Sequence, residues 1–339
     1  MNRPRHTALD EVRGLAVLIV FVSHASNDGL LPPIFGQGAG QMGVLLFFML
    51  SGYLMARIYG PQVPTPQAIR GFLMARIARI LPIYWTVLGL SALAGWMGLA
   101  VHYQVSDPGT LAQAALMIWA PQELWSIPVE VQFYAVFLLL WPWVFRVRLT
   151  PLRIIGALGV LTATAVLTYA AFDDALILLT CALPFILGLL CARIPEDTIR
   201  RLSRLGLLAL VILCLNLPGV RGLFGMELWS GFYPRLWLDP LRYLAAMFCL
   251  MTAIGAPGRW VIGGPLVFLG RISFGFYLLH RPVIRALTEA LPQGIAAEIL
   301  LLLSFTVSLA LAYLSFHLIE QPAARRLMRP VRRLQRPQP

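Results

Sequence analysis

Long apolar stretches, separated by short polar segments, run along almost the whole chain. An α-helix needs about 20 mainly apolar residues to cross the hydrocarbon core of a bilayer. Measured against that length, the stretches number about ten. Their centres lie near Val17, Leu46, Leu88, Phe137, Val160, Leu183, Ala209, Met247, Tyr277 and Leu309. The pattern therefore predicts an all-α fold, a polytopic transmembrane helical bundle of about ten spans.

The composition agrees with this class. Hydrophobic residues make up 59% of the 339 residues and charged residues 12%, whereas a soluble domain has about 25% charged residues. The four cysteines lie in apolar runs without the spacing of a metal site, so we expect buried free thiols, no disulfide framework and no metal. The start MNRPRH with its apolar run is similar to a signal peptide, but no small-residue cleavage site follows His24. We therefore expect a retained first helix.

The basic residues indicate the orientation of the bundle. With ten spans and an inside N-terminus, most of the 27 basic residues fall at the inner side. Those toward the outer side are Arg221, Arg235, Arg242, Arg281 and Arg285. The positive-inside rule then places both termini in the cytoplasm of a multi-pass protein of the cell's inner membrane. The net charge of +12 is explained by this topology, so no nucleic-acid partner is expected.

The C-terminal segment is rich in arginine and proline. Residues from Arg325 onward include Pro330, Pro337 and Pro339, and we expect a disordered stretch near anionic lipid. No internal repeat or second soluble domain is visible. The sequence thus indicates a transmembrane domain over residues 1–322 and an Arg-rich cytoplasmic tail over residues 323–339.

Two ionisable residues lie at opposite ends of the first apolar stretch. Arg13 and His24 are eleven residues apart, which at about 100° per residue comes within about 20° of three full turns. Both side chains therefore share one helix face and are separated along it by about 16 Å. Because a charged residue inside a bilayer costs about 2.5 to 3.5 kcal/mol on the insertion scale, such residues indicate a functional site.

A second group of charges precedes the third apolar stretch. Arg70, Arg76 and Arg79 lie in an amphipathic segment that we expect to follow the inner membrane surface and to turn into the membrane at Pro82. Arg76 and Arg79 are three residues apart and so face the same way, as a pair that suits phosphates. Ordinary interfacial anchoring by positive charge explains the same pattern.

Three more ionisable residues lie inside apolar segments: Glu130, His280 and Glu320. In the expected topology Glu130, His24 and His280 lie within about 5 to 8 Å of the outer boundary. A carboxylate and two imidazoles at one depth would make a proton-handling site. The alternative is that each of these polar residues has its own hydrogen-bond partners near the membrane–water interface, and that the residues form no common site.

These blocks together resemble the membrane acyltransferase family usually called acyltransferase 3, from Leu9 to about Pro322. The blocks are LDEVRGLAVLIVFVSH, GVLLFFMLSGYL, RIARILPIYW, LWSIPVEVQFY, LGRISFGFYLLHRPV and IEQP, in the family's order. Many members have a second acidic residue where Val131 stands and a glycine where Glu11 stands. No segment like the secreted hydrolase-type domain of larger members follows Pro322, so we expect the membrane-only form.

The resemblance implies transfer of an acyl group, most often acetyl, from cytoplasmic acyl-CoA to a hydroxyl of an exported or surface glycan. The implied partners are acyl-CoA as cosubstrate, a carbohydrate or lipid-linked glycan acceptor, and membrane lipid. The family's functional positions correspond to Arg13, His24, Arg76, Arg79, Glu130 and His280.

Acyl transfer to a hydroxyl needs a base, because an alcohol is a weak nucleophile at neutral pH. His24 is the candidate base, and Glu130 is a candidate to orient its imidazole. Arg13, Ser51 or backbone amides near Gly52 are candidate donors to the oxyanion.

The remaining candidates concern binding. Arg76 and Arg79 suit the phosphates of coenzyme A. His280, Ser51 and Tyr134 are candidate substrate-binding residues.

Two other functions share these features. Intramembrane His, Glu and Arg residues also line the pathways of proton-coupled transporters and flippases, although the inverted repeats or broken helices typical of such proteins are not evident here. An acyltransferase acting on a small lipophilic molecule, such as a macrolide, would share every motif.

Overall fold

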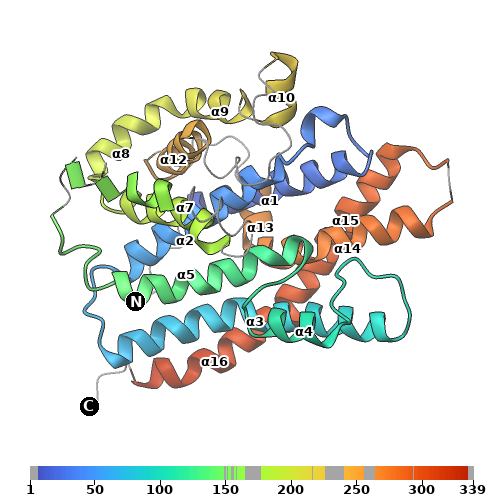
Figure 1. Cartoon of the computed structure of the whole chain (residues 1–339), viewed down its shortest axis with the longest axis horizontal. Helices are drawn as coiled ribbons and strands as arrows, with labels where there is room; N and C mark the ends of the chain where they lie inside the picture. The colour runs from blue at the N-terminus through green and yellow to red at the C-terminus, as the bar shows by residue number, and fades with distance from the viewer. Residues whose placement is uncertain are drawn as a thin grey trace. The chain divides into compact units, whose positions relative to one another are not determined.

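A computed structural model describes residues 7–334, apart from 149, 151, 154–155, 158, 165–176, 216, 226–239, 256–263 and 293. Every regular element in these described ranges is helical (Figure 1). The predicted all-α class is therefore confirmed.

Four helical stretches of the described residues are long and apolar enough to cross a membrane. They are Pro33–Tyr59, Pro66–Trp96, Gln122–Leu140 and Ala297–Arg329. They contain the predicted span centres at Leu46, Leu88, Phe137 and Leu309. The number of spans and the side of each terminus stay predictions.

The other predicted centres fall on shorter helices or on a partly described segment. Two shorter apolar helices, Cys181–Cys191 and Arg242–Gly255, contain Leu183 and Met247. The centres at Val17, Ala209 and Tyr277 lie in α1 (Thr7–Asn27), α9 (Gly206–Leu215) and α14 (Ser273–Ala290) respectively. The span predicted around Val160 runs into residues 165–176, outside the described ranges.

Internal contacts divide the chain into two compact units. The first comprises Met1–Ile58 and Trp143–Ser273, and the second comprises Tyr59–Pro142 and Phe274–Pro339. Each unit is described by itself.

The first unit is built around the N-terminal helix. Its helices are α1 (Thr7–Asn27), α2 (Gly40–Tyr59), α7 (Ile177–Cys191), α8 (Glu196–Leu202), α9 (Gly206–Leu215), α10 (Pro218–Leu223), α12 (Pro240–Gly255) and α13 (Gly264–Arg271). α1 packs against α13 and α12 (Figure 1). A Cβ at Gly14 would overlap the backbone of Leu266, and one at Gly270 would overlap the backbone of Asp10. Small residues thus let α1 and α13 approach closely.

α2 and α7 approach each other in the same way. A Cβ at Gly52 would overlap the carbonyl oxygen of Phe185, and one at Gly188 would overlap that of Met49. The rings of Phe48 and Phe185 stack with centroids 4.5 Å apart. This close, glycine-dependent packing holds the stretch of α2 that carries Ser51.

The second unit contains the longest described helix, α3, and five others. They are α3 (Pro66–Trp96), α4 (Pro108–Ala115), α5 (Ser126–Leu140), α14 (Ser273–Ala290), α15 (Ala297–Ser315) and α16 (Gln321–Leu334). A 3₁₀ turn over Gln122–Trp125 leads into α5, and a π-helical turn over Phe316–Glu320 joins α15 to α16.

The predicted turn at Pro82 is wrong, because α3 continues through this proline as one helix of 31 residues. Proline removes one backbone hydrogen bond of a helix, yet breaking a helix within lipid would leave several backbone groups unsatisfied, each at several kcal/mol. Thr86 Oγ1 donates a hydrogen bond of 2.7 Å to the Pro82 carbonyl. Buried residues on both sides, Ala78 and Ile83, continue the packing across it.

The predicted disorder of the tail is also wrong for residues 323–334, which belong to α16. Leu327, Val331 and Leu334 recur at helical spacing. α16 packs against α3 (Figure 1). Arg325 also donates a hydrogen bond of 3.0 Å to Gln321, one turn earlier. Residues 335–339 lie outside the described ranges.

Candidate functional site

α1 carries Arg13 and His24. The helix is unbroken from Thr7 to Asn27, so the eleven-residue spacing places both side chains on one face, as expected. Both residues are half-buried. Arg13 Nη1 donates to Asp10 Oδ1 at 2.7 Å.

Asp10 was not among the predicted site residues. Its side chain is 1% exposed, and the Nε of Arg271 on α13 lies 3.9 Å from its second carboxylate oxygen. The i,i+3 spacing of Asp10 and Arg13 is the sequence signal that indicates this pair. The buried carboxylate fixes the Arg13 guanidinium at the start of α1.

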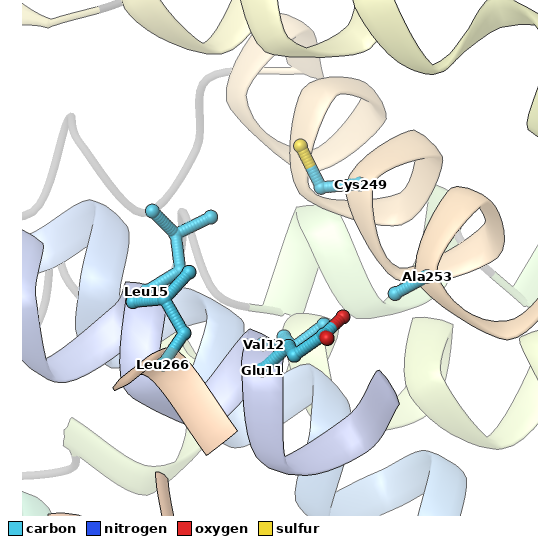
Figure 2. A pocket seen from close by; sticks show the side chains of 6 residues that line it. All are labelled: Glu11, Val12, Leu15, Cys249, Ala253 and Leu266. Carbon is cyan, nitrogen blue, oxygen red and sulfur yellow. The ribbon is translucent and has the colours of Figure 1, made fainter. Parts of the chain in front are cut away.

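Glu11 lies beside a small cavity of the first unit, between α1, α12 and α13. Figure 2 shows its carboxylate together with Cys249 and Ala253 of α12. The cavity volume is about 20 Å³, which is room for about one water molecule. Glu11 is buried, and its Oε2 has no hydrogen-bond partner among the described residues. The cavity is too small to hold a substrate.

Ser51 lies on α2, directly before the glycine that contacts α7. It is 7% exposed. A hydroxyl at this position can donate one hydrogen bond and accept others. Ser51 therefore lies in the first unit with Arg13 and His24, as a buried polar side chain.

Arg76 is enclosed by aromatic rings in the second unit. Its side chain is 8% exposed, and its Cζ lies 5.8 Å from the ring centroids of Tyr59, Phe72 and Tyr134. Its Nε has no hydrogen-bond partner among the described residues. The arrangement holds a cation in a largely desolvated site, where cation–π attraction is strongest.

Glu130 and Tyr134 connect this enclosure to a carboxylate. They lie one turn apart on α5, and the Tyr134 hydroxyl donates to Glu130 Oε1 at 2.7 Å. Because the same phenol ring also faces Arg76, the carboxylate, phenol and guanidinium form one polar group within an apolar unit. All three were expected from the sequence, but Tyr59, which ends α2 and is the first residue of the second unit, was not.

Arg79 is half-buried, three residues after Arg76. The positive charge of Arg79 interacts electrostatically with the Glu320 carboxylate and with the Tyr134 phenol. Glu320 is the last residue of the π-helical turn, and its Oε1 accepts a hydrogen bond from Ser315 at 3.3 Å. Turns of this kind occur frequently at functional sites.

His280 is fully buried on α14. Its Nδ1 lies 2.7 Å from the carbonyl oxygen of Tyr277 and 3.2 Å from that of Phe276. A carbonyl only accepts, so Nδ1 carries the hydrogen, and Nε2 is the acceptor of the neutral ring. The local backbone thus fixes both the tautomer and the ring orientation.

The predicted residues fall into two groups, one in each unit. Those of the first unit are Arg13, His24 and Ser51, and those of the second are Arg76, Arg79, Glu130, Tyr134 and His280. In the second unit the structure brings Arg76, Glu130 and Tyr134 together, with Arg79 close by. Chemically, this group offers two cations and a carboxylate next to aromatic rings, which suits binding of an anionic group.

Comparison with known proteins identifies a family whose profile matches most of the chain. The profile of the acyltransferase 3 family, described as an acyltransferase domain, matches residues 6–317. No solved structure matches the chain.

Curated relatives are similar over most of this chain. The peptidoglycan O-acetyltransferase OatA of Listeria monocytogenes is 25% identical over 93% of this chain and 55% of its own length. The O-acetyltransferase OatA of Staphylococcus aureus is 24% identical over 95% of this chain and 58% of its own length. The exopolysaccharide production protein ExoZ of Rhizobium meliloti is 27% identical over 85% of this chain and 90% of its own length. The chain thus spans a little over half the length of the two OatA proteins.

Proposed function

We propose that this chain, which belongs to the acyltransferase 3 family, transfers an acyl group, most simply acetyl, from acyl-CoA to a glycan hydroxyl. The observation that carries the proposal is the family match over residues 6–317. The acceptor would be a cell-surface or exported glycan, because relatives are named for O-acetylation of peptidoglycan and for exopolysaccharide production. The protein would lie in the inner membrane with both termini in the cytoplasm.

The reaction needs one bond to form and one to break. The hydroxyl oxygen of the acceptor attacks the carbonyl carbon of the thioester, the carbon–sulfur bond breaks, and coenzyme A leaves as the thiol. The proton of the hydroxyl passes to a base and then to the leaving sulfur. His24 is the proposed base, and Glu130 is proposed as a second catalytic residue.

The oxyanion of the tetrahedral intermediate needs preorganised donors. Arg13 and Ser51 are proposed for this role. The hydrogen bond from Arg13 to the buried Asp10 supports it, because that bond fixes the guanidinium before substrate binds.

Arg76 and Arg79 are proposed to bind the phosphates of coenzyme A. Arg79 is half-buried and can meet a phosphate directly, whereas Arg76 lies deeper among the rings, and its Nε has no hydrogen-bond partner in the described part of the chain. Guanidinium groups bind phosphate through paired hydrogen bonds. His280 and Tyr134 are proposed to contact the substrate.

The test is coenzyme A release by the purified protein in lipid nanodiscs. Acetyl-CoA is supplied with an oligosaccharide, with a macrolide, or with no acceptor, and the free thiol is measured. We expect release that depends on the oligosaccharide. Release only with the macrolide would favour the small-molecule acyltransferase. No release with any acyl-CoA would contradict the proposal and favour a transporter.

A further inference from the structure

The second unit holds a polar cluster away from Arg76 and Glu130, formed by a histidine, a glutamate and an arginine from separate segments. His102 Nε2 lies 2.6 Å from Glu123 Oε2, and Arg281 Nε donates to Glu123 Oε1 at 3.1 Å. The two carboxylate oxygens therefore each take one partner. The His102 side chain is only 7% exposed, so its position is fixed by Glu123.

Hydrogen bonds to the backbone hold this cluster in place. The Tyr277 hydroxyl donates to the Glu123 carbonyl at 2.9 Å and accepts from Ser126 Oγ at 2.9 Å. The Tyr103 hydroxyl donates to the Leu278 carbonyl at 2.9 Å. Burial raises the pKa of Tyr103 well above its ordinary value, so the phenol remains a donor. The bond from Tyr103 thus holds the segment that carries His102 against α14, and the contact between His102 and Glu123 holds it against the turn that leads into α5.

His102 lines a cavity of about 280 Å³ within the second unit. This volume is close to the lower end of the roughly 300–1,000 Å³ of small-molecule sites, which suits one ring and not an extended chain. Leu90, Val101 and Leu279 form apolar parts of the wall. The lining residues with polar groups are Ser91, His102, Tyr103, Arg285 and Glu289.

The charges around the cavity are balanced. Arg285 Nε lies 2.7 Å from Glu289 Oε1, and Arg281 is paired with Glu123. An anion such as phosphate would have to compete with these carboxylates for each guanidinium. A neutral ligand with several hydroxyls meets no such competition, because hydroxyls both donate to carboxylates and accept from guanidinium groups.

His102 adds an acceptor to this wall. An ionised carboxylate only accepts hydrogen bonds, so Nε2 donates to Glu123, and Nδ1 is the acceptor of the neutral ring. An imidazole oriented in this way can accept a hydrogen bond from a ligand hydroxyl.

We infer that this cavity binds one neutral polyhydroxylated ring, a sugar residue of the acceptor, with His102 accepting from one of its hydroxyls. Its role as the acceptor subsite rests on the proposed function. Glu123 acts here as a positioning residue, since it fixes His102 and is held by Arg281.

The experiment uses saturation-transfer NMR on the full chain in nanodiscs, with methyl β-D-glucopyranoside as the probe. We expect a signal from wild type and at least about tenfold weaker binding by His102→Gln, as for loss of a strong hydrogen bond in a buried site. His317→Gln is the matched control, because it makes the same change at an exposed position of the same unit. It should bind like wild type.

A second pair of variants keeps the inference testable if His102→Gln fails to fold. Ala286 is exposed and lines the cavity, whereas Thr288 on the same helix is exposed and does not line it. Ala286→Trp should abolish the signal by filling the cavity, and Thr288→Trp should leave it unchanged.

Two results would overturn the inference. One is equal glucoside binding by wild type, His102→Gln and Ala286→Trp. The other is binding of 1-octanol or inorganic phosphate, with no glucoside binding, that Ala286→Trp abolishes. Glucoside binding sensitive to His102, without any coenzyme A release, would support the sugar site while contradicting the proposed function.

Discussion

Arg76 is a cation kept almost entirely out of water by three aromatic rings. Desolvating a charge is expensive unless partners compensate, and a desolvated cation–π contact contributes about 2 kcal/mol. Tyr134 compensates in two ways, since its ring faces Arg76 while its hydroxyl bonds Glu130. The residue-scale organisation of the site is thus a buried guanidinium coupled to a carboxylate through one phenol.

Arg79→Ala tests the proposed binding of coenzyme A. Arg79 is half-buried, so the variant should fold, and loss of one phosphate contact should raise the KM for acetyl-CoA about tenfold with little change in kcat. Steady-state kinetics of coenzyme A release measure this. Arg70→Ala is the control, because Arg70 is an exposed arginine of the same helix. Equal KM values for the two variants would mean that Arg76 and Arg79 anchor the protein at the membrane surface and do not bind coenzyme A.

Tyr134→Phe tests the link to Glu130. The ring stays next to Arg76, but the carboxylate loses a hydrogen bond worth about 1.5–3 kcal/mol, so we expect kcat to fall about tenfold or more. Tyr84→Phe removes another buried phenolic hydrogen bond of the same unit, to the Ala114 carbonyl. It should lower stability and leave kcat near wild type. A similar loss of kcat in both variants would mean that Tyr134 acts only on stability.

The site residues differ in how clearly the sequence indicates them. Arg76, Glu130 and Tyr134 stand in recognisable blocks, and Asp10 could have been found from its i,i+3 spacing to Arg13. His102 and Glu123 could not, because they lie 21 residues apart in the sequence and their segments meet only in the folded structure. No local spacing indicates a pair of that kind.

At the scale of elements, two predictions failed because a local rule was applied without its packing context. Pro82 was expected to end a surface helix, but the membrane penalises broken backbone more than one lost hydrogen bond. The arginines and prolines of 323–334 suggested disorder, but these residues belong to α16, which packs against α3. The length of an apolar run predicted the presence of a helix better than it predicted the residues at which the helix begins and ends.

Gly188→Ala tests the close approach of α2 and α7. A Cβ at Gly188 would overlap the Met49 carbonyl oxygen, and overpacking of this kind destabilises by about 1–3 kcal/mol. We expect a lower thermal unfolding midpoint in detergent. Gly89→Ala is the control, since a Cβ there meets no atom within 4 Å, and alanine favours the helix by up to about 1 kcal/mol. An unfolding midpoint as high in Gly188→Ala as in the control would contradict the packing.

At the scale of the whole molecule, the all-α class and the family followed from the sequence, because apolar run length and motif order are properties of the chain itself. The division into two compact units did not, since it depends on contacts between residues such as Arg57 and Glu196, which are paired at 3.1 Å within the first unit. The proposed chemistry distributes its residues over both units. Arg13, His24 and Ser51 belong to the first unit, and Arg76, Arg79 and Glu130 belong to the second.

Transfer of label from acetyl-CoA to an acceptor tests the central claim most directly. The full chain in nanodiscs is supplied with radiolabelled acetyl-CoA and an oligosaccharide, and free thiol and ester-linked label are both measured. We predict equal amounts of thiol and ester for wild type, and neither product for a folded His24→Ala variant. Acetyl-CoA left intact by wild type, or equal transfer by His24→Ala, would contradict the account.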